Sequence, residues 1–196
     1  MKKKRAAVTE ADNKRRQRVS YGILIVTGVL ILLATGFISW NWLIEKDLYK
    51  AFVINFVGTS LLIAGGVALC VFFLHLIAII VFKNPQQIKK SSVAKFAVGG
   101  IITLSIVIFL LFWGVNEARK SLEDMNAYAN ADWQVKDLGV TDVYRGSKPS
   151  KIILINTAEG EMVLHWERFR VQKGQTYRFA YLDATKTIIN VELIQE

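Results

Sequence analysis

The stretch that decides the fold is AFVINFVGTSLLIAGGVALCVFFLHLIAIIVF, Ala51–Phe82, in which 32 consecutive residues include no Asp, Glu, Lys or Arg. A helix needs roughly 20 mainly apolar residues to cross a bilayer. Ile23–Ile44 and Phe96–Val115 are also uncharged and long enough. The sequence therefore predicts a membrane protein with three transmembrane helices, spanning residues 21–44, 51–82 and 94–116.

The apolar run at 51–82 is longer than one crossing requires. As a helix it would measure about 48 Å, against a hydrocarbon core of about 30 Å. The excess is absorbed if the helix tilts, lies partly along the outer interface, or extends into the cytoplasm. Asn55 favours an interfacial start, and we expect a tilted helix that reaches the membrane surface at both ends.

The formal net charge of +9 is concentrated in two segments that flank the predicted spans. Residues 1–20 contain eight Lys and Arg against two acidic residues, and residues 83–95 contain four Lys and no acidic residue. The segment 45–50 is neutral, and residues 117–196 are slightly acidic. Because Lys and Arg are retained on the cytoplasmic side, we expect a cytoplasmic N-terminus and a C-terminal domain outside the membrane.

The only cysteine is Cys70, inside the second span, so the predicted outer domain contains no disulfide. An extracytoplasmic domain without disulfides is more typical of bacterial envelope proteins than of secreted eukaryotic domains. We therefore expect the protein in the plasma (cytoplasmic) membrane of a bacterium.

Two basic clusters precede the first span, Lys2–Arg5 and Lys14–Arg18. Such juxtamembrane clusters attract anionic lipid headgroups. The topology already accounts for both clusters, and the C-terminal domain has no basic excess. We therefore expect the lipid bilayer, and no nucleic acid, as their partner.

Small residues recur along the second and third spans and predict close helix packing. They let two helices approach, which drives association where lipid offers no hydrophobic contrast. Packing among the three helices of one chain is the simpler interpretation, and an intermolecular seam that would produce an oligomer is the alternative. The candidate packing residues are Ser60, Ala64, Gly65, Gly66 and Ala68 in the second span and Gly99 and Thr103 in the third.

His75 is the only Asp, Glu, Lys, Arg or His within the three apolar runs. An ionisable residue inside a membrane is a functional candidate by default. A proton relay or metal site also needs partner groups, and the runs supply none. We therefore interpret His75 as an intramembrane polar contact within the helices or with a partner. The same scarcity of polar residues disfavours a coupled transporter.

Beyond the third span, helical spacing continues to Ala131. We expect residues 117–132 to form a juxtamembrane helix and linker with a Glu117–Lys120 pair. The apolar face of this helix is predicted to consist of Ala118, Leu122, Met125 and Ala129.

From Trp133 the apolar period changes to two, which indicates strands. Five short strands with regular turns predict a small antiparallel β-barrel over residues 133–196. The long first strand, interrupted at Gly139, favours an OB-like barrel, with an SH3-like barrel as the alternative. After that first strand, which runs from Val135 to Val143, the others are expected at 151–157, 162–166, 176–182 and 187–194.

Three aromatic residues of the fourth strand, Tyr177, Phe179 and Tyr181, share one face. We expect them in the core of this small domain, because large aromatic side chains are usually buried.

The sequence contains no nucleophile elbow, H-E-x-x-H motif, P-loop or dinucleotide fingerprint. His165 is expected to be a lone surface residue of a strand, and the acidic residues of the outer domain are scattered singly. We therefore predict no catalytic, cofactor-binding or metal-binding residues, no cofactor and no enzymatic activity.

These patterns together predict an α+β membrane protein with a basic cytoplasmic tail at 1–20, a transmembrane part at 21–116, a linker at 117–132 and an extracytoplasmic domain at 133–196. The expected function is that of a non-catalytic integral membrane subunit or accessory protein of a cell-envelope assembly. Its outer domain would bind another membrane or envelope protein. The alternatives are a membrane-borne immunity protein against a toxin and, less favoured, a small transporter or channel.

Overall fold

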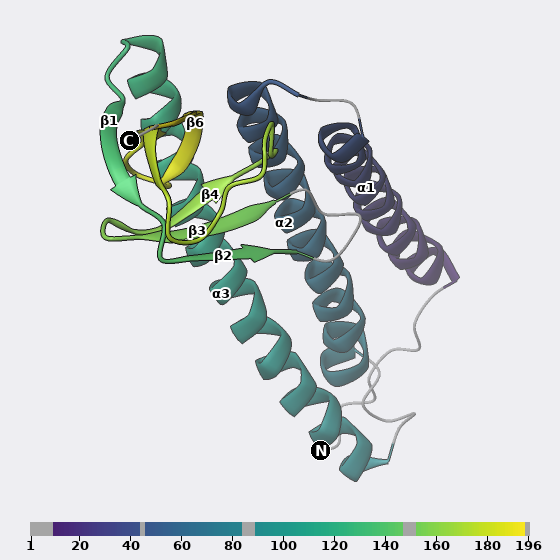
Figure 1. The fold of residues 1–196 in the computed structure, drawn as a ribbon. Helices are drawn as coiled ribbons and strands as arrows, with labels where there is room; N and C mark the ends of the chain where they lie inside the picture. The colour runs from purple at the N-terminus through teal and green to yellow at the C-terminus, as the bar shows by residue number, and fades with distance from the viewer. Residues whose placement is uncertain (1–9, 44–45, 84–88, 147–151, 195–196) are drawn as a thin grey trace. The chain divides into compact units, whose positions relative to one another are not determined.

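The structure is a computed structural model, which describes residues 10–43, 46–83, 89–146 and 152–194. Three long helices precede six strands along the chain (Figure 1). The helices are α1 (Glu10–Leu43), α2 (Leu48–Ala78), continued by the π-helical turn η1 (Ile79–Lys83), and α3 (Lys90–Ala129). The strands are β1 (Gln134–Gly139), β2 (Asp142–Arg145), β3 (Ile153–Thr157), β4 (Gly160–Leu164), β5 (Thr176–Leu182) and β6 (Thr187–Leu193).

All three helices are long and apolar enough to span a membrane, which confirms the prediction of a membrane protein. The candidate spans are Asp12–Leu43, Leu48–Phe82 and Ser91–Ala129. In the apolar 18-residue stretch that identifies each span, at most 11% is buried inside the described structure. Most of that apolar surface is therefore left for lipid or for the helices of a partner.

The chain forms two compact units, and each helix contributes to both. The first, here called the helical unit, consists of Met1–Leu32 and Leu61–Trp113. The second, here called the sheet unit, consists of Leu33–Ser60 and Gly114–Glu196, and therefore includes helix ends as well as all six strands.

The first three turns of α2 belong to the sheet unit, although most of their residues lie in the second apolar run. Ala51 and Phe52 are only 1% and 4% exposed, so protein covers these two side chains. The tilt expected for α2 stays a prediction.

The six strands form one open mixed sheet in the order β1-β5-β6-β4-β3-β2. All neighbours are antiparallel except β4 and β6, which pair in parallel at Val163 and Thr187. The predicted five-stranded antiparallel barrel is therefore wrong in strand number, in strand direction and in closure. Alternation shows which face of a strand is buried, but it does not show which strand lies beside it.

The sixth strand arises because the expected first strand breaks just after Gly139. β1 pairs with β5, and β2 pairs with β3 at the opposite end of the sheet. Between them, Val140 donates a hydrogen bond to the Gln175 carbonyl, and Thr141 donates one to the Asn156 carbonyl. Two residues thus redirect the backbone from one edge of the sheet to the other. The other strands occur close to their predicted positions, and Lys151, the expected start of one, lies outside the described residues.

The core of the sheet contains the aromatic residues predicted for it. Tyr177, Phe179 and Tyr181 are at most 1% exposed, which confirms their assignment to the core. The Tyr177 hydroxyl donates to Gln175 Oε1 at 2.6 Å and accepts from the Gln172 amide at 2.9 Å. The other buried members of this cluster are Leu138, Val140, Ile153, Ile155, Met162, Leu164, Val171 and Ile188.

The outer part of α3 is helical as predicted, but it buries a different face. Lys120 lies 3.8 Å from Glu117, as the sequence indicated. Leu122, however, is 56% exposed, whereas Ser121 and Asp124 are 7% and 1% exposed. The buried face therefore differs from the predicted apolar face, because Asp124 of this helix hydrogen-bonds to the turn between β5 and β6.

Candidate functional site

Two of the helix ends in the sheet unit are joined by an aromatic stack. Asp47 caps α2, since its Oδ1 accepts a hydrogen bond from the Lys50 amide at 2.9 Å. The cap places Tyr49 in the first turn, where its ring stacks on that of Tyr128 in α3. The ring centroids are 3.5 Å apart and the planes differ by 8°. Trp133 extends this cluster, with its ring 5.7 Å from that of Tyr128.

A buried carboxylate connects α3 to the turn between β5 and β6. Asp124 accepts hydrogen bonds from the Ala184 amide at 2.9 Å and the Thr185 amide at 2.8 Å, and a third from the Thr185 hydroxyl. We call these three residues the Asp124 clasp. The Thr187 hydroxyl lies 2.7 Å from that of Thr185 and continues the network into β6. Charged hydrogen bonds of this kind are among the strongest that a carboxylate makes.

The connection between β4 and β5 is fixed to β2 by an arginine. Arg145 donates to both carboxylate oxygens of Glu167, at 3.2 and 2.6 Å, and to the Val171 carbonyl at 2.6 Å. The hydrogen bonds to Glu167 raise the pKa of Arg145. Glu167 Oε1 in turn accepts from the Val171 amide at 2.8 Å. These bonds hold the segment between Glu167 and Val171 in a defined conformation.

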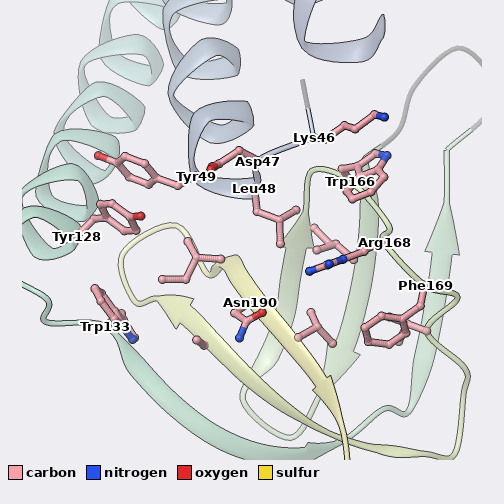
Figure 2. Close-up of a pocket in the computed structure, with 15 residues that line it drawn as sticks. Lys46, Asp47, Leu48, Tyr49, Tyr128, Trp133, Trp166, Arg168, Phe169 and Asn190 are labelled. Carbon is pink, nitrogen blue, oxygen red and sulfur yellow. The ribbon is translucent and has the colours of Figure 1, made fainter. Parts of the chain in front are cut away.

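A pocket of about 380 Å³ lies between the helix ends, the β4–β5 connection and the sheet (Figure 2). This volume falls within the usual range for small-molecule sites. The aromatic lining residues are Tyr49, Tyr128, Trp133, Trp166 and Phe169. The charged and amide-bearing lining residues are Lys46, Asp47, Arg168 and Asn190, and the aliphatic ones are Leu48, Leu164, Val171, Ala180, Ile189 and Val191.

Arg168 is positioned by the segment that Arg145 and Glu167 hold in place. Figure 2 shows its guanidinium reaching into the pocket, with Leu48 on one side and Asn190 on the other. The Asn190 amide donates to Glu192 Oε1 at 3.1 Å. The pocket thus combines a cation, an amide and flat apolar walls, a combination suited to binding an amphiphilic ligand.

His165 lies at the end of β4 and is buried, so the prediction of a surface histidine is wrong. It is 5% exposed, and its ring centroid lies 6.1 Å from that of Phe52 in α2. Burial lowers its pKa to about 4. Its Nδ1 has no hydrogen-bond partner among the described residues. The sequence did not indicate that α2 covers this strand end.

His75 lies in the part of α2 that belongs to the helical unit. Its side chain is half-buried, and its Nε2 has no hydrogen-bond partner within the described ranges. The expected polar contact therefore stays a prediction. His, Cys, Asp and Glu side chains nowhere form a group of three that could hold a metal ion in the described part of the chain.

The glycines among the predicted packing residues lie at two different helix pairs of the helical unit. A Cβ at Gly65 would stand 3.0 Å from Ile31 of α1, and one at Gly66 would stand 3.6 Å from Leu110 of α3. Both distances favour packing within the chain. The other small residues of the second span, which are spaced four apart, are less buried. Ala64 is exposed, and Ser60 and Ala68 are half-buried.

In the third span, the two predicted residues interact with each other along the helix. The Thr103 hydroxyl donates to the Gly99 carbonyl at 2.8 Å. A Cβ at Gly99 would meet nothing within 4 Å, whereas one at its neighbour Gly100 would lie 3.2 Å from Ile77 of α2. The role predicted for Gly99 and Thr103 in close packing is not tested by these contacts.

A close approach of α1 and α2 occurs at Gly58, which sequence reasoning missed. A Cβ there would stand 2.9 Å from Ile38 Cγ1 and 3.4 Å from the Ile38 backbone nitrogen. We expect Gly58→Leu to reduce stability by about 1–3 kcal/mol, because the added side chain must separate α1 from α2. The thermal midpoint in detergent, followed by circular dichroism at a helix wavelength, measures this loss.

Gly28→Leu is the matched control, since a Cβ at Gly28 meets nothing within 4 Å. Both substitutions replace a helical glycine and gain similar helix propensity. Equal thermal midpoints for the two variants would contradict close packing at Gly58.

No family model matches the chain, and neither a curated protein nor a solved structure does so. The site is therefore interpreted from its own residues. Sequence reasoning missed Asp124, Arg168 and Tyr49 as parts of a site. A single carboxylate, cation or tyrosine in a linear sequence gives no signal of a shared location.

Proposed function

We propose that this chain is a non-catalytic integral membrane subunit or accessory protein of a bacterial cell-envelope assembly. Its N-terminus lies in the cytoplasm, its three helices cross the plasma membrane, and its sheet domain lies outside. The sheet domain binds another membrane or envelope protein. The distribution of Lys and Arg around the spans supports this orientation.

The observation that carries the proposal is the Asp124 clasp. Three hydrogen bonds to one buried carboxylate fix the β5–β6 turn to α3. A domain that only needed to be near the membrane would be held well enough by a flexible linker. A fixed attachment instead limits how the β5–β6 turn can move against the end of α3, and it reduces the entropy lost when a partner binds the sheet.

The contact surface that we propose is the edge of the sheet at β2. Tyr144 on this strand is 65% exposed, and tyrosine is enriched at protein interfaces. Within the described ranges β2 pairs only with β3, so its other edge has no strand neighbour there. On α3, Ile108 and Phe112 are 60% and 77% exposed and offer an apolar surface to lipid or to a partner helix.

The proposal is tested by crosslinking from outside intact cells. Asp142 lies on the same exposed face of β2 as Tyr144, two residues away. Asp142→Cys, made in a Cys70→Ala background, is treated with a membrane-impermeant reagent that carries a maleimide and a photoreactive group. We expect labelling at this position and photocrosslinks to a reproducible set of membrane or envelope proteins. Adding Tyr144→Ser should reduce the crosslinked yield severalfold, because interface tyrosines often contribute more than 1 kcal/mol.

Ser91→Cys in the same background is the topology control, since this exposed residue lies within the basic 83–95 segment. It should not react in intact cells and should react after permeabilisation. The reverse labelling pattern would overturn the orientation. Labelling at Asp142→Cys without any reproducible crosslinked protein would leave the orientation standing and remove the assignment as a subunit.

A further inference from the structure

The pocket of the sheet unit is lined in part by residues at the start of α2, which is one of the candidate membrane spans. α1 ends at Leu43 and α2 begins at Leu48, and residues from Lys46 to Tyr49 line the pocket. Trp40 of α1 is 53% exposed and is typical of the aromatic belt at a membrane boundary. In the chain, Lys46 to Tyr49 thus lie between two uncharged runs, one of which ends at Ile44 and the other of which begins at Ala51.

The pocket contains a cation whose charge is not neutralised by an acid. Among the described residues, Arg168 has no hydrogen-bond or ion-pair partner, in contrast to Arg145 and Arg178, which each bind a carboxylate. Among the residues that the structure describes, Asp47 is the only acid that lines the pocket, and its Oδ1 accepts the capping hydrogen bond of α2. A guanidinium in this setting is suited to bind two oxygens of a phosphate group.

The remaining walls favour a ligand larger and more apolar than a free phosphate ion. Trp133, Trp166 and Phe169 line the pocket beside the Tyr49–Tyr128 stack. Its volume of about 380 Å³ exceeds ten times the volume of a water molecule in the liquid, about 30 Å³. Indole and phenol rings contact the boundary between headgroup and acyl chain favourably, because they are apolar with a polar edge.

We propose that this pocket binds the headgroup of an anionic phospholipid from the surrounding membrane. Arg168 holds the phosphodiester oxygens, and the aromatic rings contact the glycerol and the first methylene groups. The assignment does not depend on which protein the sheet domain binds. Lipid binding at this pocket differs from the attraction of lipid to the basic N-terminal clusters. It depends on a single arginine, Arg168, which follows the three uncharged apolar runs in the chain, whereas the clusters precede them.

The experiment compares phosphatidylglycerol with phosphatidylcholine on the full-length chain. The protein is equilibrated in detergent micelles that contain both lipids in equal amount, and retained lipid is measured by native mass spectrometry. We expect the Arg168→Gln variant to retain about tenfold less phosphatidylglycerol relative to phosphatidylcholine than the unmodified chain. This corresponds to the loss of one charged hydrogen-bonding group.

Arg170→Gln is the matched control. It removes the same charge two residues away, from an exposed arginine that lines a separate hollow with Lys173. Its lipid ratio should equal that of the unmodified chain, and because both variants keep the basic N-terminus, lipid bound there cancels in the comparison. Equal ratios for Arg168→Gln and Arg170→Gln would overturn the proposal.

Two further outcomes would also overturn it. If soluble glycerol 3-phosphate displaces the retained lipid at concentrations equal to that of the lipid itself, the pocket recognises free phosphate esters. If Arg168→Gln leaves lipid retention unchanged but removes the photocrosslinked proteins, the pocket is a protein site. The latter result would leave the proposed function standing.

Discussion

Replacing Asp124 with alanine should lower the free energy of unfolding of the sheet unit by about 2–4 kcal/mol. The substitution removes three hydrogen bonds to a carboxylate that is 1% exposed. It also leaves the amides of Ala184 and Thr185 without their acceptor, and unpaired buried donors add to the loss. Urea unfolding of the full-length protein in detergent, followed by strand circular dichroism, measures the change.

Asp183→Ala is the control for the clasp, since Asp183 lies in the same turn but is exposed. Its carboxylate lies 2.6 Å from Lys186 Nζ, and its side chain is 69% exposed. An exposed pair of this kind is worth at most about 1 kcal/mol. If Asp124→Ala and Asp183→Ala unfold at the same urea concentration, the clasp does not attach the sheet to α3.

Acid should destabilise the sheet unit between about pH 6.5 and pH 4 through His165. Burial lowers the pKa of His165 to about 4, whereas an unfolded chain binds the proton near pH 6.5. Above pH 6.5 both states are neutral and no stability is lost. As the pH falls through this window, only the unfolded state gains a proton, and stability decreases by about 1.4 kcal/mol per unit, or about 3 kcal/mol in total.

Urea unfolding at several pH values measures this slope, and His165→Gln should flatten it because glutamine does not titrate. The contribution of Asp137 to stability should be lost below this pH range and can be told apart from that of His165. The hydrogen bonds from Arg178 lower the pKa of Asp137, so its contribution to stability is lost at more acidic pH than that of His165. An unchanged slope in His165→Gln between pH 6.5 and 4 would exclude His165 as the cause.

The helices and strands were predictable because their signals are local. An uncharged run such as Ala51–Phe82 has few interpretations besides a membrane span. The alternation of Tyr177, Phe179 and Tyr181 likewise has one simple reading, a strand with a buried face. These patterns require no knowledge of any other part of the chain.

The order of the strands was not predictable from the same signals. β6 lies between β5 and β4, and one of its contacts is parallel, although alternation in the sequence is equally compatible with an antiparallel meander. The break between Gly139 and Thr141 was visible as an interruption, but the sequence does not say that it sends β1 and β2 to opposite edges.

The candidate site was even less accessible to sequence reasoning. Its walls come from the start of α2, the end of α3, the β4–β5 connection and β6. These segments are far apart in the chain. Asp124 was overlooked because helical periodicity identifies the buried face of a helix by its apolar residues. A buried carboxylate is an exception to that rule. Only its partners, more than fifty residues later, show why the helix turns a polar face inward.

The position of β6 within the sheet also determines when the domain is able to fold. It is the last strand to be synthesised, yet it lies in the interior of the sheet and connects β5 to β4. Until it is made, β1 with β5 and β2 with β3 and β4 form two separate fragments, each with an uncovered edge. We therefore expect an unfinished chain to keep its apolar strand faces exposed until β6 has been made, as incompletely folded domains do.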